Sequence, residues 1–144
     1  MNQLSKFLRM PRMDRALLIR AMVLIGAVRV GLWLLPFRMI GHFAEWLVKK
    51  STHSQVREPA SIQHVIWAVR IASGYIPAAT CLTQALVTKI LLQRYGYPAV
   101  VRIGVTRGAT GRFLAHAWVE TNGSIVIGGS VISLKRYTPL LSLN

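Results

Sequence analysis

Residues 80–128 have the sequence TCLTQALVTKILLQRYGYPAVVRIGVTRGATGRFLAHAWVETNGSIVIG, and this stretch decides the fold. Its first part predicts a helix that begins at Cys81, because Thr80 is a suitable N-cap and Gly96 is placed to end the helix. One face of this helix carries Leu82, Ala85, Leu86 and Ile90. The apolar spacing therefore predicts that the helix packs on the rest of the domain.

After the helix the hydrophobic period changes from a helical one to two. Residues 99–105 alternate as a strand does, and residues 113–121 predict a second strand after a glycine-rich turn. The dipeptide Asn122-Gly123 is a strong hairpin signal, which makes 124–128 the return strand. A helix followed by a small antiparallel sheet indicates an α+β fold.

The front of the chain is apolar. Residues 16–39 are nearly long enough to span a bilayer, which requires about 20 apolar residues. Arg20 and Arg29 would each be costly near the centre of a membrane. We therefore favour a helix that is buried or lies in the membrane interface over a transmembrane span.

The middle and the end of the chain carry weaker signals. A second short helix is expected over 37–50, followed by a polar connection over 51–61. Ser61 is a candidate cap for a further helix over 62–73. The segment 131–144 shows no period, and we expect it to be irregular and to lie along the edge of the sheet.

The length of 144 residues fits one compact unit. Within it we expect a helical N-terminal section over residues 1–60, packed on a core over 61–144 in which the Cys81 helix packs on the sheet. The single cysteine excludes an intramolecular disulfide and indicates a reducing compartment. We expect no signal peptide in the first residues, because arginines precede or interrupt the apolar run.

Charge is the second unusual feature, since 18 Lys and Arg oppose 4 Asp and Glu for a net charge of +14. The basic residues are mostly single and are not interleaved with aromatic residues, so nucleic-acid binding is not expected. No standard zinc spacing occurs, and we expect neither a metal nor a cofactor. His53 and His64 are expected to be solvated, whereas the tryptophans are expected to be core or membrane-facing.

Cys81 and His116 are the candidates for chemistry. Cys81 would lie in the first turn of its helix, where unpaired N–H groups and the helix dipole favour a thiolate. His116 lies in the middle of the strand FLAHAWVE, on one face with Leu114, Trp118 and Glu120. A lone cysteine is usually a small buried hydrophobe, and a core histidine is often held by one carbonyl. A nucleophile at a helix start with a base on the following sheet is, however, the arrangement of papain-like and transglutaminase-like enzymes.

At these residues the chain resembles a family. The segments CLTQALVTKILLQRYGYPAVVRIGV (81–105), LAHAWVE (114–120) and NGSIVIGG (122–129) are similar to the transglutaminase-like leader peptidases of lasso-peptide biosynthesis, of the microcin-processing type. The helix RALLIRAMVLIGAVRVGLWLLPF (15–37) resembles the front section of that family, so the similarity covers roughly residues 15–140. The resemblance implies a cysteine protease with Cys81 as nucleophile and His116 as general base.

The chain departs from the family at one position. The resemblance implies an orienting aspartate about a dozen residues beyond the histidine, where this chain has Ile127 and two glycines, one of them Gly128. Glu120 is the nearest acid, but four strand residues place it roughly 13 Å along the strand from His116. Glu120, Gln84 and Gly128 are candidate orienting or oxyanion groups. Glu45 or Glu58 from elsewhere in the chain, a backbone carbonyl or an amide could also orient His116. A dyad and a slow or inactive protein both remain open.

Three functions follow as alternatives. The first is removal of the leader from a ribosomally made precursor during lasso-peptide maturation, with a small leader-recognition protein and a macrolactam cyclase as implied partners. The second is a catalytically degenerate basic scaffold that binds the leader or the cyclase. The third is acyl transfer, which shares the thioester with hydrolysis. We expect a cytoplasmic protein, with peripheral contact at the inner face of the membrane left open.

Overall fold

The computed structural model describes residues 3–34, 39, 42–43, 45–46, 49, 60–76, 80–128 and 137–143. In chain order the elements are α1 (Gln3–Arg9), α2 (Arg12–Leu34), α4 (Ile62–Tyr75), α5 (Cys81–Arg94), β1 (Val100–Arg107), β2 (Phe113–Thr121), β3 (Ser124–Ile127) and β4 (Thr138–Leu143). Helices precede strands along the chain, and the architecture is α+β, as predicted.

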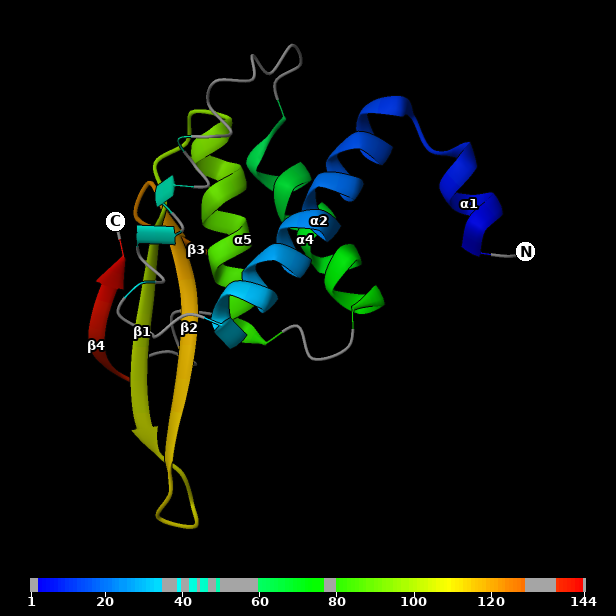
Figure 1. The fold of residues 1–144 in the computed structure, drawn as a ribbon. Coiled ribbons are helices and arrows are strands. Elements are labelled where there is room, and N and C mark those ends of the chain that lie inside the picture. The colour runs from blue at the N-terminus through cyan, green and yellow to red at the C-terminus, as the bar shows by residue number, and fades with distance from the viewer. Residues whose placement is uncertain are drawn as a thin grey trace.

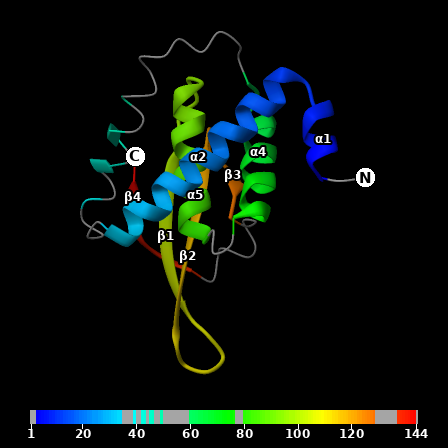
Figure 2. The same cartoon turned by 45° about the vertical axis from the view of Figure 1, so that its right-hand side comes forward.

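The helices form one layer and the sheet forms another (Figure 1). Helix α2 packs on both α4 and α5, and α5 also contacts β1, β2 and β3. Figure 2 shows α2 crossing in front of α5, with the sheet behind. Because α5 lies between α2 and the sheet, it is the central helix of the fold.

Local signals set both ends of α5. The Thr80 side chain accepts a hydrogen bond from the Thr83 amide, as an N-cap does. At the other end Gly96 takes a positive φ of 86°, and the Tyr97 amide donates to the Leu92 carbonyl at 2.9 Å. This is the Schellman arrangement that commonly ends a helix at glycine. The predicted start and stop of the helix are therefore confirmed.

The sheet is antiparallel and has the strand order β3-β2-β1-β4. Strand β1 pairs with β2 along its whole length, with Gly104 opposite His116. Asn122 and Gly123 both have positive φ, at 50° and 78°, so the predicted hairpin turn between β2 and β3 is confirmed. The β1–β2 hairpin ends beyond the helices (Figures 1 and 2).

The prediction that residues 131–144 are irregular is wrong for the last part of this segment. Residues 138–143 form β4, which pairs with β1 at the edge of the sheet, with Val101 opposite Leu143. The segment TPLLSL has no alternation, and Pro139 would exclude it from a central strand. An edge strand tolerates proline, because one of its two sides needs no partner. Residues 131–136 lie outside the described part of the chain.

Two predictions about the front of the chain need adjustment. Helix α1 was not predicted, and α2 begins four residues earlier than the apolar run does. Most of the helix predicted over 37–50 lies outside the described residues, although positions 39, 42, 43, 45, 46 and 49 are helical. The connection predicted over 51–61 is described only at its last two positions, and the domain boundary at residue 60 stays a prediction.

One hydrophobic core joins the helices to the sheet. Its members include Leu17, Ala21 and Val28 from α2, Val65 and Val69 from α4, Leu86 and Ile90 from α5, and Val101, Ala117 and Val119 from the sheet. His64 on α4 is not simply solvated, as was predicted, because its Nε2 lies 2.7 Å from Asp14 Oδ1 on α2. This contact and the shared core tie α2 to α4.

Candidate active site

Cys81 is the first residue of α5 and is half-buried. Its side chain packs against the edge of the hydrophobic core. The backbone N–H groups of Cys81 and Leu82 have no acceptor within the helix, because no helical carbonyl precedes the first turn. The thiol therefore lies where a helix presents partial positive charge.

Gln84 lies one turn into α5 and was predicted as a possible oxyanion group. Its backbone N–H donates to the Thr80 carbonyl at 3.0 Å, and its carbonyl accepts the Thr88 hydroxyl at 2.7 Å. The backbone N–H of Gln84 is thus used by the helix itself, and an oxyanion role of its side chain stays a prediction. The backbone N–H groups at the start of α5 are better placed to bind an oxyanion.

His116 lies in the middle of β2, and its ring is held from two sides. Its Nε2 is hydrogen-bonded to the Gly128 carbonyl, twelve residues further along the chain. The Tyr137 ring lies 5.5 Å away, centroid to centroid, at an interplanar angle of 35°. A carbonyl can only accept, so Nε2 carries the proton and Nδ1 of the neutral ring is the basic nitrogen.

Gly128 can be no other residue in this arrangement. Its φ is +99°, and a Cβ added there would lie 2.7 Å from the Ala117 carbonyl oxygen and 2.8 Å from the Trp118 Cα. Both contacts are with the backbone of β2, which cannot move to admit a side chain without a loss of stability. The chain therefore has a carbonyl, rather than an aspartate, at the position twelve residues after the histidine.

Glu120 does not orient His116. One carboxylate oxygen accepts the Trp118 indole N–H at 3.1 Å, and the other accepts Arg102 Nε at 2.8 Å. Burial acts to raise the pKa of Glu120, but the hydrogen bonds from Arg102 and Trp118 and the Arg102 charge outweigh it, so the pKa is lowered. The predicted common face of His116, Trp118 and Glu120 is confirmed, since the Tyr137 ring contacts both His116 and Trp118.

Two residues that shape this site were missed. Gly104 lies opposite His116, and a Cβ there would come within 3.0 Å of the Trp118 ring and of the Tyr137 Cβ. Gly104 could have been found from the sequence, because the register of the hairpin pairs it with His116. Tyr137 could not, because the approach of the C-terminal segment to β1 leaves no local pattern.

The structure packs α5 on β2 but does not join the two candidate side chains. Figures 1 and 2 show the N-terminal end of α5 level with the middle of the β1–β2 hairpin. Ala117 and Val119 belong to the core that α5 shares. Because side chains alternate along a strand, His116 lies on the other face of β2. Between these two described residues no hydrogen bond links Cys81 and His116. The dyad stays a prediction.

A comparison with protein families identifies the domain. The model of the Transglutaminase-like superfamily matches residues 21–142. The chain belongs to this superfamily. No curated protein and no solved structure matches the chain.

Members of the transglutaminase-like superfamily are typically cysteine-dependent enzymes, and the superfamily includes both cysteine peptidases and transglutaminases. The matched region contains Cys81, His116 and Gly128. It also contains residues 21–34 of α2, so more than half of α2 lies within the superfamily domain. A thiol-dependent chemistry is thus the general expectation for this fold.

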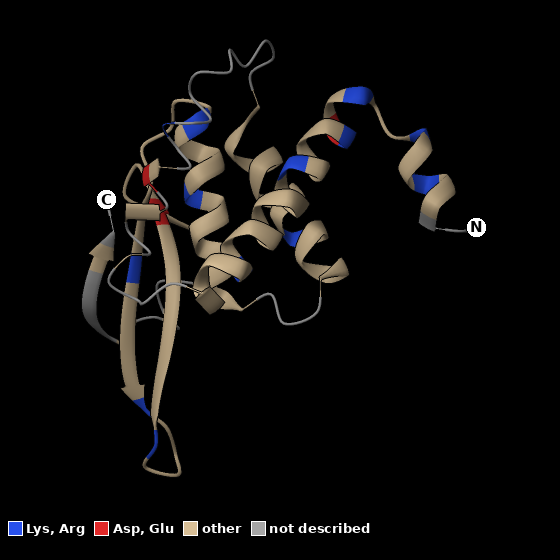
Figure 3. Ribbon diagram, viewed as in Figure 1, with Lys and Arg blue, Asp and Glu red and all other residues tan. Residues whose placement is uncertain are grey.

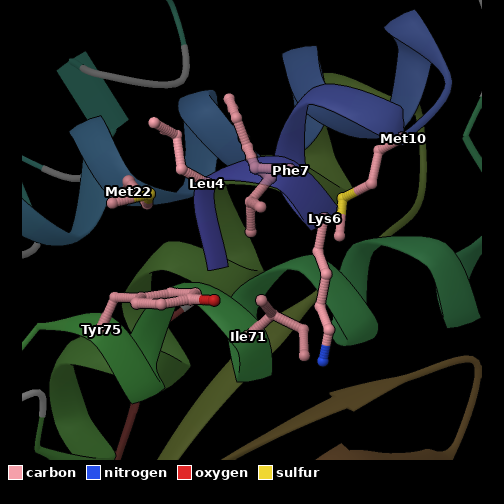
Figure 4. A pocket seen from close by; sticks show the side chains of 8 residues that line it. Leu4, Lys6, Phe7, Met10, Met22, Ile71 and Tyr75 are labelled. Atoms are coloured by element: carbon pink, nitrogen blue, oxygen red, sulfur yellow. The ribbon is translucent and has the colours of Figure 1, made fainter. Parts of the chain in front are cut away.

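An apolar cavity of about 420 Å³ lies elsewhere, between α1, α2 and α4 (Figure 4). Phe7, Met10, Met22 and Ile71 contribute to its lining, and neither Cys81 nor His116 does. Among the described residues no group of three or more His, Cys, Asp or Glu side chains could hold a metal ion. The cavity therefore belongs to the helical layer and is separate from the candidate active site.

Proposed function

We propose that this transglutaminase-like protein is a cysteine peptidase that removes the leader from a ribosomally made precursor during lasso-peptide maturation. Superfamily membership supports thiol chemistry. The finer assignment is supported by the resemblance of the Cys81-Leu82 and His116-Ala117-Trp118 motifs to lasso-peptide leader peptidases. Proposed partners are the precursor leader, a small leader-recognition protein and the macrolactam cyclase, in the cytoplasm.

The proposed reaction uses both candidate residues. The Cys81 sulfur attacks the scissile carbonyl carbon as His116 Nδ1 takes the thiol proton. The Cys81 N–H would stabilise the oxyanion, and the imidazolium then protonates the departing amine as the C–N bond breaks. Water next attacks the thioester carbonyl carbon as His116 takes a proton from it. The C–S bond then breaks, His116 returns the proton to the Cys81 sulfur, and the carboxylate product leaves.

The observation that carries this proposal is the hydrogen bond between His116 Nε2 and the Gly128 carbonyl. In a serine protease, replacing the aspartate by asparagine lowers the rate by about 10⁴ because the histidine adopts the wrong tautomer. The Gly128 carbonyl does not cause the wrong tautomer, because it accepts a hydrogen bond only from a protonated Nε2 and leaves Nδ1 free to act as base. It brings no negative charge, so the imidazolium gains less stabilisation than in a triad.

The pairing also needs a change in the relative position of the two side chains. In unliganded enzymes catalytic hydrogen bonds are often long or poorly aligned, and they tighten when substrate binds. Helix α5 packs on the face of β2 that carries Ala117 and Val119, whereas His116 lies on the other face, so the approach requires the start of α5 or the middle of β2 to move. The proposal therefore predicts that a bound precursor brings the Cys81 sulfur within hydrogen-bond reach of His116 Nδ1.

The test is cleavage of precursor by purified protein in the presence of the leader-recognition protein, followed by mass spectrometry. Cys81→Ala should abolish leader release, and His116→Ala should lower its rate by about 10³-fold or more. His64→Ala is the matched control, because it removes an imidazole that pairs with Asp14 between α4 and α2. Leader release by Cys81→Ala at the wild-type rate contradicts the proposal.

A second candidate is a non-catalytic scaffold that binds the leader. It is favoured by the lack of a hydrogen bond between Cys81 and His116 and by the carbonyl that stands where an acid is expected. In that case no product forms, while Cys81→Ala and wild type bind the leader equally. Acyl transfer, the third alternative, would be recognised by product mass, because an amine rather than water is then added to the acyl group.

A further inference from the structure

Helix α2 has two apolar faces. One face is buried in the core through Leu17, Ala21, Leu24, Ile25 and Val28. The other face is exposed to solvent. Its large apolar side chains and their exposed fractions are Ile19 49%, Val23 65%, Val30 54%, Trp33 85% and Leu34 65%. Spacings of three, four and seven residues place these side chains in one stripe along the helix.

Packing in the hydrophobic core does not account for the apolar residues of the exposed stripe. The apolar window of α2 has a mean hydropathy of 2.0, high enough for a membrane helix, yet only 39% of it is buried in the molecule. A helix that is apolar on all sides belongs either in a core or in a membrane. Soluble proteins rarely leave a continuous apolar patch of this kind in water.

The same helix is poorly suited to cross a bilayer in this fold. Its buried face packs on α4 and α5, and Arg20 donates to the Tyr95 hydroxyl at 3.2 Å. Crossing a membrane would remove this face from the core and take Arg20 into hydrocarbon. The exposed stripe can instead meet a membrane from the side while the buried face stays in place.

Basic residues lie on α1 and at the start of α2, the helix that carries the stripe. Lys6, Arg9 and Arg12 are exposed, and they alternate with the exposed side chains of Leu4 and Leu8. Figure 3 shows Lys and Arg on α1 and on the N-terminal half of α2. The nearest acid in this region, Asp14, already pairs with His64. The surface therefore offers apolar side chains together with unbalanced positive charge.

We propose that α1 and the exposed stripe of α2 dock on the surface of an anionic lipid bilayer, with α2 lying parallel to the membrane plane. The apolar side chains enter the boundary between headgroups and acyl chains, and Lys6, Arg9 and Arg12 pair with anionic headgroups. An anionic bilayer is the occupant that matches both the apolar stripe and its positive charge. The docked face includes neither Cys81 nor His116, and the proposal does not depend on the function of Cys81.

The cavity under α1 extends this surface. Leu4 is exposed and also lines the cavity, so the cavity opens beside an exposed apolar side chain of α1. Figure 4 shows Lys6 and Tyr75 among the apolar side chains of the lining. An apolar cavity binds apolar groups readily, so the end of a lipid acyl chain is a suitable occupant once α1 lies on the bilayer.

The test is co-sedimentation of the full chain with large unilamellar vesicles. Vesicles with about 30% phosphatidylglycerol should bind the protein, and pure phosphatidylcholine vesicles should bind it at least about tenfold more weakly. Raising the salt from about 0.1 M to about 0.5 M should release much of the bound protein, because salt screens exposed charges. Cys81→Ala should bind like wild type, which separates this proposal from the proposed function.

The decisive variant is the double substitution Val23→Gln and Trp33→Gln, which should weaken binding to phosphatidylglycerol vesicles by about tenfold or more. The matched control is the double substitution Phe113→Gln and Leu114→Gln, on β2 at the end of the hairpin, where the side chains are 70% and 51% exposed. The control should bind like wild type. Circular dichroism would show that both variants are folded.

Three outcomes overturn the proposal. The first is equal binding by wild type and the α2 variant, and the second is equal binding to anionic and neutral vesicles. The third is a concentration-dependent increase in mass without vesicles that the α2 variant abolishes, because a second copy of the chain would then cover the stripe. Light scattering of wild type and variant at several concentrations distinguishes this case.

Discussion

Gly128 takes a positive φ and has no room for a Cβ, and its carbonyl holds the imidazole of His116. Gly128→Ala should therefore both destabilise the fold and lower activity. Gly111→Ala is a matched control, because Gly111 also has a positive φ, 80°, but has no atom within 4 Å of an added Cβ.

The expected loss for Gly111→Ala is about 1–2 kcal/mol from the left-handed backbone alone. Gly128→Ala should lose more than this, because steric overlap with the β2 backbone adds to the same cost. Chemical denaturation measures both values. Equal losses in the free energy of unfolding of the two variants would contradict the steric overlap that the structure shows at Gly128.

Glu120 gives a prediction about pH. The pKa of its carboxyl is lowered in the fold, so the carboxylate contributes stability above the unfolded value of 4.5, and this contribution is lost as pH falls through the folded pKa. Glu120→Gln should lower the free energy of unfolding by about 1 kcal/mol at pH 7. The difference from wild type should disappear in strong acid.

Denaturation at several pH values tests this sign. Arg112→Gln is the control, because Arg112 is exposed and should change stability little at every pH. A loss for Glu120→Gln that is the same at all pH values would show that the network with Arg102 and Trp118 acts through shape rather than charge.

The candidate residues could be predicted, but the contacts between them could not. Cys81 and His116 follow from a capped helix and from an apolar strand with one imidazole. The glycine at position 128 reads in the sequence as a missing acid, whereas the structure shows its carbonyl bonded to His116. A backbone carbonyl has no sequence signature, so only the fold could show this contact.

At the scale of elements, the cap of α5 can be tested against the cap of α4. Thr80 accepts from the Thr83 amide and also bonds the Thr83 hydroxyl at 3.0 Å, and Ser61 accepts from the His64 amide at 3.1 Å. Thr80→Ala and Ser61→Ala should each cost about 1 kcal/mol of stability.

The two cap variants should differ in the chemistry of the thiol. Thr80→Ala frays the turn that positions Cys81, so the rate at which iodoacetamide alkylates Cys81 should change. Ser61→Ala should leave that rate unchanged, because α4 begins elsewhere. An equal effect of both variants would indicate a general loss of stability and not a role for the α5 terminus.

Elements with strong local signals were predicted well. Helix α5, strands β1 and β2 and the Asn122-Gly123 turn each carry a cap, a period or a turn signal within their own residues. Strand β4 and helix α1 were not predicted, because they depend on contacts with β1 and with the α2–α4 groove. Such long-range contacts leave no local pattern.

At the scale of the whole molecule, Lys89 lies at the centre of the packing. It is 1% exposed on α5, and burial lowers its pKa, an effect that the Glu45 charge partly opposes. The unfolded chain therefore holds the proton more tightly than the folded one. Stability should rise as pH increases from the lowered pKa towards the unfolded value of 10.5.

Lys89→Met removes the buried amine while keeping most of the side-chain volume. We expect this variant to be about 1 kcal/mol more stable at neutral pH and to lose the rise at alkaline pH. Lys6→Met is the control, because Lys6 is exposed and the change should be within about 0.5 kcal/mol. A less stable Lys89→Met protein would show that the buried amine is well compensated by its surroundings.

The central claim is that Cys81 is an activated nucleophile and that His116 activates it. Its most direct test is the rate at which iodoacetamide alkylates Cys81 near pH 7, with the precursor leader peptide bound, in wild type, His116→Gln and the control His64→Gln. The account predicts that wild type and His64→Gln react much faster than a small free thiol, and that His116→Gln reacts at least about tenfold more slowly than wild type. Equal rates for wild type, His116→Gln and the free thiol would contradict it.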